Sequence, residues 1–297
     1  MRVVVFRPIN DTCTGAFRIG SILDDGRIAD LTPEGLSRIS CESELLKFFD
    51  LELGPLRNTA PGRTFERTEV TLVAPVPRPG KVICVGLNYR DHAEESGLPI
   101  PESPIIFSKF PTSITGPDLP IKLPHGSSEV DYEAELAVII GRRASRVSST
   151  DAMDYVFGYA NFNDVSARDF QFADGQWQRG KSCDTFGPLG PFVLTRDEVA
   201  DPHDLRIRFR LNGETLQDSN TGQMIFRIPE LIEFISGSIT LEPGDVIATG
   251  TPPGVGFARS PKIFLRSQDI AEVEIEGLGV LRNPIVGEEG QDVRSAK

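Results

Sequence analysis

The sequence predicts a β-rich α+β fold with a small α+β unit at the N-terminus. Short segments that are rich in β-branched residues or that alternate apolar and polar residues recur along the chain, as in strands. Helical patterns are few, and they do not alternate regularly with strands, which argues against a doubly wound sheet. The proline- and glycine-rich segment 74–80 is typical of a linker, and it divides the chain into domains 1–73 and 74–297.

The N-terminal domain contains two predicted strands and one predicted helix. Residues 3–6 and 17–23 form apolar, β-branched runs, and a turn is expected directly after them at Asp25-Gly26. Residues 43–49, SELLKFF, predict a short helix. This domain carries no recognisable catalytic pattern, so a role in packing or dimer formation is expected.

The second domain is predicted to consist mainly of short strands. Residues 81–89, KVICVGLNY, start as a buried strand and end in a Gly-Leu-Asn loop. Further strands are predicted at residues 105–110, 135–140, 205–211, 245–249, 262–265 and 271–276. Two helices are predicted, at residues 149–159 and 228–236, and the second has Pro229 near its start, where helices tolerate proline.

Composition and charge exclude several classes of partner. The formal net charge is −12 and no polybasic run is present, so nucleic acid is not an expected partner. No apolar stretch approaches the ~20 residues that span a bilayer, so no membrane partner is expected. The N-terminal apolar segment is too short for a signal peptide, and the four scattered cysteines contain no CxxC pair. Free thiols and a cytoplasmic location are therefore expected.

Four acidic residues alternate along EVDYEAELAVIIG, residues 129–141. In a strand, Glu133 and Glu135 would lie on one face, roughly 6–7 Å apart along the chain, and Asp131 would share that face. A solvated strand face is the simpler interpretation, but the strand continues into the apolar LAVII, and Asp164 follows in a second acid-bearing segment. Carboxylates gathered at the edge of a core suggest a hard divalent cation, and an all-oxygen ligand set favours Mg²⁺, Mn²⁺ or Ca²⁺ over zinc.

A histidine–glutamate pair is predicted in GLNYRDHAEESG. One helical turn starting at Asp91 would place Glu95 on the same side as His92, where it can orient the imidazole for general base catalysis on a water. A surface histidine beside an acidic helix start is the alternative. HAEE lacks the second histidine of HExxH, so a zinc protease is not supported. His125 and His203 lie in loop contexts and are expected to be structural or exposed.

Two further segments carry candidate binding groups. Lys181 lies among small, turn-forming and apolar residues, where it could present a cation to an anionic substrate, although it could equally be an ordinary loop lysine. The run DVIATGTPPGVG, residues 245–256, predicts a strand that ends in a loop able to offer N–H groups and hydroxyls to carboxylates, or a generic tight turn. No GxSxG elbow and no Walker A sequence are present.

The motifs taken together resemble the fumarylacetoacetate hydrolase family. GLNYRDHAEE, VDYEAELAVIIG, NDVSARDFQ, GKSCDTFGPLGP, SNTGQMIF and GDVIATGTPPGVG occur in the order seen in that family, over roughly residues 75–285. The resemblance is to the short members, and it implies a mixed β-sandwich roll behind a small N-terminal domain, usually paired as a homodimer.

The resemblance also implies a role for each matching residue. Glu133, Glu135 and Asp164 match the metal ligands, His92 and Glu95 a catalytic dyad on a short lid helix, and Lys181 the lysine that faces the reacting carbonyl. Arg168, Gln171 and Thr251 match substrate-binding residues. Fumarylacetoacetase itself has a further Asp ligand seven residues before its histidine, where this chain has Val85. A site of three carboxylates is therefore implied, and true fumarylacetoacetase activity is not expected.

The resemblance implies an Mg²⁺-dependent enzyme that acts on a small-molecule 2-oxo acid. The first expectation is hydrolysis of a C–C bond in an acylpyruvate-type diketo acid, through a metal-held enolate with water activated by His92 and Glu95. The alternative is an oxaloacetate tautomerase or decarboxylase that uses the same groups. A second alternative is a non-catalytic binding protein on the same fold, against which the intact dyad, ligands and lysine argue.

Overall fold

The computed structural model describes residues 1–9, 17–32, 62–173 and 175–287. The helix expected at residues 43–49, Cys13 and Cys41 lie outside these residues. Within the described part, Cys84 and Cys183 are free thiols, as expected.

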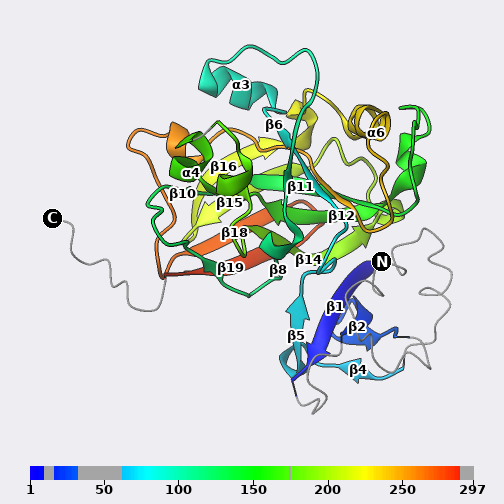
Figure 1. Cartoon of the computed structure of the whole chain (residues 1–297). Coiled ribbons are helices and arrows are strands. Elements are labelled where there is room, and N and C mark those ends of the chain that lie inside the picture. Colours follow the sequence, from blue (N-terminus) through cyan, green and yellow to red (C-terminus); the bar gives the residue numbers. More distant parts are fainter. Residues whose placement is uncertain (10–16, 33–61, 174, 288–297) are drawn as a thin grey trace.

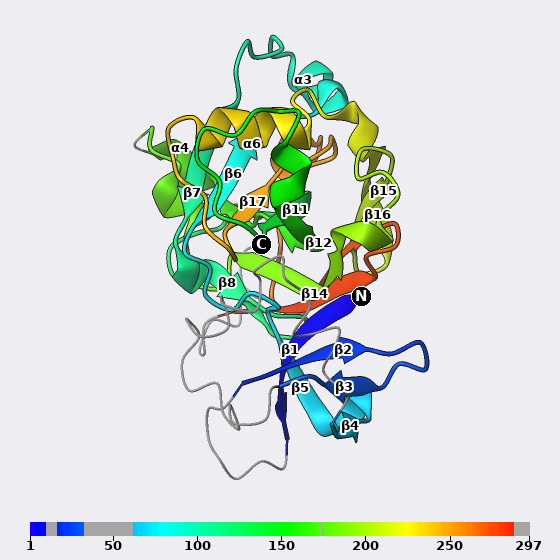
Figure 2. The same cartoon turned by 90° about the vertical axis from the view of Figure 1, so that its right-hand side faces the viewer.

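The N-terminal strands extend the main sheet of the protein. They are β1 (Arg2–Pro8), β2 (Arg18–Ile22), β3 (Ile28–Asp30), β4 (Thr64–Phe65) and β5 (Val70–Val73). The strand β1 lies between β2 and β14 (Gly187–Thr195) in the sheet and also pairs with β5. Figure 2 shows these strands as a smaller unit that joins the larger body at β14. The strands predicted at residues 3–6 and 17–23 are thus confirmed, while the domain boundary at residues 73/74 stays a prediction.

The main sheet is mixed. Its order is β4-β3-β2-β1-β14-β12-β11-β17-β6-β7, where only β17 and β6 run parallel along this path. The strands not yet bounded are β6 (Val82–Gly86), β7 (Ile105–Lys109), β11 (Ala134–Ile140), β12 (Val156–Asn163) and β17 (Val246–Ala248). In addition, β8 (Ile114–Thr115) runs parallel to β14. All residues of β11 and β12 are buried, so these strands form the centre of the larger body.

A second sheet packs against β11 and β12 (Figure 1). Its five strands are β16 (Glu214–Asn220), β15 (Arg206–Leu211), β18 (Ile270–Ile275), β19 (Val280–Val286) and β9 (Ile121–Lys122). A two-stranded ladder joins β10 (Val130–Asp131) to β13 (Ser166–Ala167). The described helices are α3 (Arg90–Ser96), α4 (Arg168–Ala173), α5 (Gln178–Lys181) and α6 (Ile228–Ser236), and short 3₁₀ turns include η4 (Ala152–Tyr155) and η7 (Gly256–Ala258). The predicted β-rich α+β class is confirmed, as is the helix at residues 228–236.

Two predicted elements are wrong. The helix expected at residues 149–159 is only the turn η4, after which β12 begins at Val156. The reason is tertiary: β12 is buried between β11 and β14, and a Cβ on Gly158 would lie 2.2 Å from the Leu194 carbonyl oxygen. The strand expected at residues 262–265 is irregular, because Ile263 N–H donates to Gly256 and Leu265 N–H donates to Val130 instead of to one partner strand.

Aromatic stacking connects the second sheet to the segment that carries the acidic residues. The rings of Phe209 on β15 and Tyr132, just after β10, lie parallel with centroids 4.1 Å apart, and both are fully buried. We expect Phe209→Ala to lower the free energy of unfolding by about 3–5 kcal/mol, because it leaves a cavity. Phe234→Ala, on the exposed side of α6, should cost about 1 kcal/mol or less. Urea unfolding of both variants checks this, and equal losses would contradict it.

Candidate functional site

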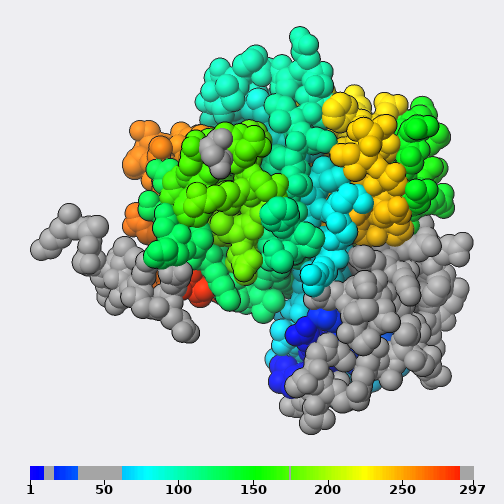
Figure 3. Space-filling model, viewed as in Figure 1, coloured from blue at the N-terminus to red at the C-terminus, as the bar shows by residue number. Residues whose placement is uncertain are grey.

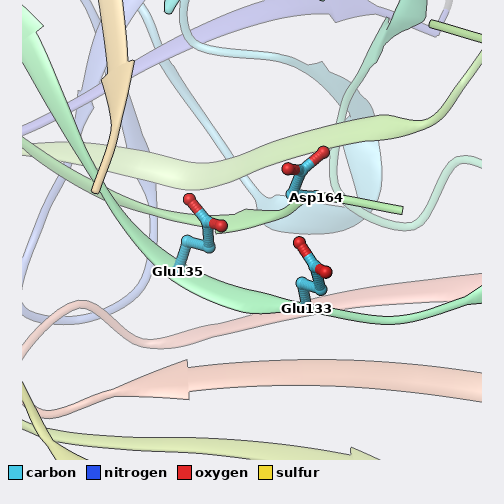
Figure 4. Close-up of side chains that lie close together, drawn as sticks. All are labelled: Glu133, Glu135 and Asp164. Carbon is cyan, nitrogen blue, oxygen red and sulfur yellow. The ribbon is translucent and has the colours of Figure 1, made fainter. Parts of the chain in front are cut away.

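Three buried carboxylates meet where β11 and β12 lie side by side. Glu133 directly precedes β11, Glu135 lies on it, and Asp164 directly follows β12. The Asp164 N–H donates to the Glu133 carbonyl at 2.9 Å, which holds the two segments together. Figure 4 shows the three side chains gathered in one place, and one oxygen of each lies within 4.8 Å of the others. This cluster could hold a metal ion.

Three buried cationic side chains contact this cluster. Lys181 Nζ lies 2.7 Å from Glu133 Oε2 and 2.7 Å from Asp164 Oδ2. Arg168 donates to Glu133 Oε1 at 2.6 Å, and Lys109 donates to Asp164 Oδ1 at 2.6 Å. Burial by itself would raise the pKa of Glu133, but the charges of Lys181 and Arg168 outweigh it and lower the pKa to about 2. Glu133 is therefore ionised at neutral pH.

Glu135 has no cationic side chain within 4 Å among residues 62–173 and 175–287. The one hydrogen bond that its carboxylate accepts from these residues comes from the Gly250 N–H, at 3.0 Å to Oε2. Burial, and then the charges of Asp164 and Glu133, raise its pKa well above the usual value. A buried carboxylate facing two others is costly unless a cation neutralises it. The oxygen-only donor set fits a hard divalent cation such as Mg²⁺, Mn²⁺ or Ca²⁺.

The predicted histidine–glutamate pair forms on α3. His92 Nδ1 lies 3.0 Å from Glu95 Oε2, and the Gly254 N–H donates to Glu95 Oε1 at 2.9 Å. Burial tends to raise the pKa of Glu95, but its hydrogen bonds with His92 and Gly254 outweigh this and lower the pKa. Glu95 therefore stays charged and fixes the imidazole, as the sequence predicted.

One cavity of about 310 Å³ brings the candidate residues together. Of the nine residues singled out in the sequence, seven line it: His92, Glu133, Glu135, Arg168, Gln171, Lys181 and Thr251. The other two do not line the cavity but contact residues that do: Glu95 pairs with His92, and Asp164 accepts a hydrogen bond from Lys181. Apolar side chains complete its wall: Val85, Leu87, Leu98, Phe107, Phe172, Trp177 and Phe257. Of the elements around it, α3 and α4 reach the surface on the face seen in Figure 3.

The proposed substrate-binding residues are held by their neighbours. Arg168 donates through one terminal nitrogen to Gln171 Oε1 at 3.0 Å. The Thr251 hydroxyl donates to the Ala134 carbonyl at 2.9 Å and accepts from Gln217 Nε2 at 2.9 Å. These contacts fix the side chains before any ligand arrives.

A larger hollow of about 580 Å³ lies elsewhere, over β15 and β18. Its arginines are already paired, Arg206 with Asp218 and Arg208 with Glu274. It lacks the dyad and the carboxylate cluster, so we assign the site to the smaller cavity. The other two histidines lie outside the candidate site, as expected. His125 is exposed, and His203 accepts a hydrogen bond from the Ile228 N–H at the start of α6.

Two residues at the site differ from the sequence analysis. Asp131 is not one of the three clustered carboxylates: it lies on β10, before the interruption at Tyr132 and Glu133 that separates β10 from β11, and Arg168 bridges it to Glu133. Lys109 was missed although its side chain is fully buried against Asp164. The sequence could have indicated this residue, because Lys109 lies within the mainly apolar run IIFSKF, where a buried charge without a partner would be costly.

Comparison with known proteins shows which family the chain belongs to. The family model described as "Fumarylacetoacetate (FAA) hydrolase C-terminal" matches residues 81–286. The chain belongs to the fumarylacetoacetate hydrolase family. Human "Oxaloacetate tautomerase FAHD2A, mitochondrial" is 53% identical over 222 residues, which are 74% of this chain and 71% of that protein. The Xenopus laevis "Oxaloacetate tautomerase fahd2, mitochondrial" is 44% identical over 96% of this chain and 90% of its own. The resemblance to this family that the motifs indicated is thereby confirmed.

Solved structures of the family share the fold. A fumarylacetoacetate hydrolase from Exiguobacterium antarcticum has a TM-score of 0.81 at 35% identity, covering 97% of this chain and 99% of that chain. A 5-carboxymethyl-2-hydroxymuconate delta-isomerase from Mycobacterium smegmatis has a TM-score of 0.78 at 37% identity, covering 97% and 100%. These likenesses confirm the expected roll with its N-terminal unit. Within the described residues, no helix is long and apolar enough to cross a membrane.

Proposed function

We propose that this family member is a keto–enol tautomerase of a small 2-oxo acid, with oxaloacetate as its substrate. The observation that carries the proposal is one cavity lined both by His92, which is paired with Glu95, and by Glu133 and Glu135 of the buried three-carboxylate cluster. The sequence favoured C–C hydrolysis first. The names of the relatives support the alternative, since tautomerases and an isomerase are among them.

A divalent cation fits the charge balance of the site. Of the four buried carboxylates, those of the cluster and Asp131, three contact the cationic side chains Lys109, Arg168 and Lys181, and Glu135 contacts none in the described part of the chain. The surplus negative charge would repel an oxo acid. Glu133, Glu135 and Asp164 would hold Mg²⁺, and the bound ion would withdraw electrons from the keto group and so acidify the neighbouring C3–H.

The cationic side chains bind and orient the substrate in this proposal. Arg168 has five N–H groups, and its contacts with Asp131, Glu133 and Gln171 leave one terminal N–H for the cavity. Lys181 donates two of its three N–H groups to Glu133 and Asp164. Burial alone would lower the pKa of Lys181, but the charges of Asp164 and Glu133 raise it, so the ammonium persists. The remaining N–H groups can hold the substrate's carboxylate.

His92 moves the proton. Glu95 occupies Nδ1, so Nε2 is the atom free to remove a proton from C3 of the keto form or to return it in the reverse direction. A second proton is exchanged at the keto oxygen, so tautomerisation neither consumes nor releases other atoms. The apolar wall, including Leu98 and Phe172, limits access of water to the site.

Hydrolysis of an acylpyruvate is the second candidate. The apolar residues Phe107, Trp177 and Phe257 line the cavity and could accept an acyl chain. The same dyad would then activate a water, as the sequence suggested.

An ultraviolet assay with enol-oxaloacetate tests the proposal. We expect the enol absorbance to disappear faster with protein and Mg²⁺ than with Mg²⁺ alone, while neither pyruvate nor CO₂ appears. Chelation of the cation should remove the acceleration. Pyruvate together with a second acid from an acylpyruvate would identify a hydrolase instead, and CO₂ from oxaloacetate a decarboxylase. No metal-dependent change with any 2-oxo acid would favour a non-catalytic binding protein.

The expectations about partners and location remain predictions. We propose a homodimer whose ligand is the 2-oxo acid, without nucleic acid or membrane as a partner. Light scattering of the purified chain tests the dimer. The cytoplasmic location contrasts with the word "mitochondrial" in the names of the human and Xenopus relatives, and imaging of the tagged protein tests it.

A further inference from the structure

Asp131 is a buried carboxylate that neither the metal cluster nor the dyad includes. It is fully buried, so its charge must be compensated by close partners. Arg168 supplies two contacts to Oδ2, at 2.9 Å from Nε and 2.8 Å from a terminal nitrogen. Backbone N–H groups supply the others: Gly256 at 2.7 Å and Tyr132 at 2.8 Å to Oδ1, and Phe257 at 3.1 Å to Oδ2. Every lone-pair direction of Asp131 is thus occupied.

These partners come from two segments that are far apart in the chain. Arg168 begins α4, whereas Gly256 and Phe257 belong to the loop of residues 251–258. The Phe257 ring also packs on the guanidinium of Arg168, 4.4 Å from its centre. At Gly256 an added Cβ would lie 2.6 Å from Asp131 Oδ1 and 1.8 Å from the Ile263 carbonyl oxygen. Asp131 therefore holds the loop close to Arg168, and the backbone at position 256 lies so near to Asp131 that only glycine fits there.

The same loop supports the catalytic dyad. Two residues before Gly256, the Gly254 N–H donates to Glu95, which in turn orients His92. The Gly254 carbonyl accepts from the Tyr132 hydroxyl at 3.0 Å, so residues 131 and 132 together fix both ends of this short stretch. A continuous set of contacts runs from Arg168 through Asp131 and the loop to Glu95.

We propose that Asp131 is a positioning residue that couples the substrate-binding Arg168 to the His92–Glu95 dyad. It fixes the direction in which Arg168 presents its free N–H, and it fixes the loop whose Gly254 N–H holds Glu95. Part of this inference rests on the proposed function, because Arg168 is taken to bind the substrate's carboxylate.

The variant Asp131→Asn tests the coupling. It keeps the shape of the side chain but replaces one acceptor oxygen by an amide group, which must then face either Arg168 or the N–H groups of the loop. With enol-oxaloacetate we expect KM to rise and kcat to fall by about tenfold or more each, because both binding and proton transfer depend on placement. Amide exchange of peptides covering residues 90–96 and 251–258 should become about fivefold faster or more.

Two further variants separate positioning from general loss of structure. Asp169→Asn removes a neighbouring charge on α4 whose hydrogen bonds, within the described residues, go to Ser127, Ser128 and the start of its own helix. Both kinetic constants and the exchange should therefore stay within about twofold. Arg168→Lys removes the same two-point contact by changing the partner of Asp131 instead of Asp131 itself. This substitution should accelerate amide exchange at residues 251–258, although Arg168 itself lies on α4. In the double variant with Asp131→Asn, the loss of kcat/KM should be smaller than the sum of the two single losses in free energy.

The outcomes distinguish this inference from the proposed function. Additive effects of the two substitutions, or exchange at wild-type rates in both variants, would overturn the coupling. If Asp131→Asn fails to fold, Arg168→Lys alone decides, and unchanged loop exchange in it rejects the coupling. If the wild-type protein turns over no 2-oxo acid, the proposed function fails, while the exchange measurements still test the link between Arg168 and the loop.

Discussion

Replacing His92 by alanine is expected to lower kcat for enol-oxaloacetate by about 10²–10⁴-fold, the usual contribution of a general acid–base group. The imidazole lines the cavity and is oriented by Glu95 at 3.0 Å, and no other histidine lines this cavity among the described residues. The hydrogen bond described for its ring goes to Glu95 and not to a carboxylate of the cluster. Stopped-flow loss of the enol absorbance measures the effect, and Mn²⁺ titration calorimetry should give an unchanged Kd.

Two controls sharpen this result. His203→Ala removes a histidine whose described contacts are Asp201 and the start of α6, so kcat should not change. Glu95→Gln keeps the size of the dyad partner but removes its charge, so we expect a smaller loss of kcat than in His92→Ala. Near-wild-type turnover in His92→Ala would remove this residue from the mechanism.

Replacing Glu135 by glutamine is expected to have opposite effects on metal binding and on the stability of the metal-free protein. The substitution removes one of three candidate ligands, so the affinity for Mg²⁺ should collapse, and turnover with it. It also removes a carboxyl group whose ionised form is unfavourable in the metal-free protein, because burial and the charges of Asp164 and Glu133 raise its pKa. The metal-free variant should therefore unfold at a higher temperature than the wild type.

Calorimetric unfolding with and without Mg²⁺ measures both effects. At a Mg²⁺ concentration of 100 times Kd, the wild-type protein should gain about 2.7 kcal/mol of stability, and Glu135→Gln should gain almost none. Glu129→Gln is the matched control, because it removes another acid of the same run that lies outside the cluster. A full Mg²⁺-dependent gain in Glu135→Gln would rule out the proposed cation site.

Local patterns in the sequence were sufficient for much of this site. The spacing of His92 and Glu95 depends only on one helical turn, and Glu133 and Glu135 are two residues apart at the start of β11, so both pairs could be predicted without knowing the rest of the fold. Arg168, Gln171, Lys181 and Thr251 came from ordered motifs that resemble the family. The helix at residues 228–236 followed from its own apolar periodicity.

Other features depended on partners that are distant in the chain. Val156–Asn163 is a strand because β11 and β14 bury it from both sides, which no local propensity reveals. Likewise, the pairing of Lys109 with Asp164 spans 55 residues, and that of Asp131 with Gly256 spans 125.

The sequence by itself thus determined which side chains are available for chemistry, because their local spacing and motif order are written in consecutive residues. Only the tertiary structure decided which carboxylates form the cluster, and that Asp131 lies outside it, bound by Arg168 and by the loop of residues 251–258. Asp131 precedes the interruption at Tyr132 and Glu133, and the fold brings to it the guanidinium and the backbone N–H groups that compensate its burial. Burying a charge is costly without such partners, so the role of each acid follows from its neighbours in space.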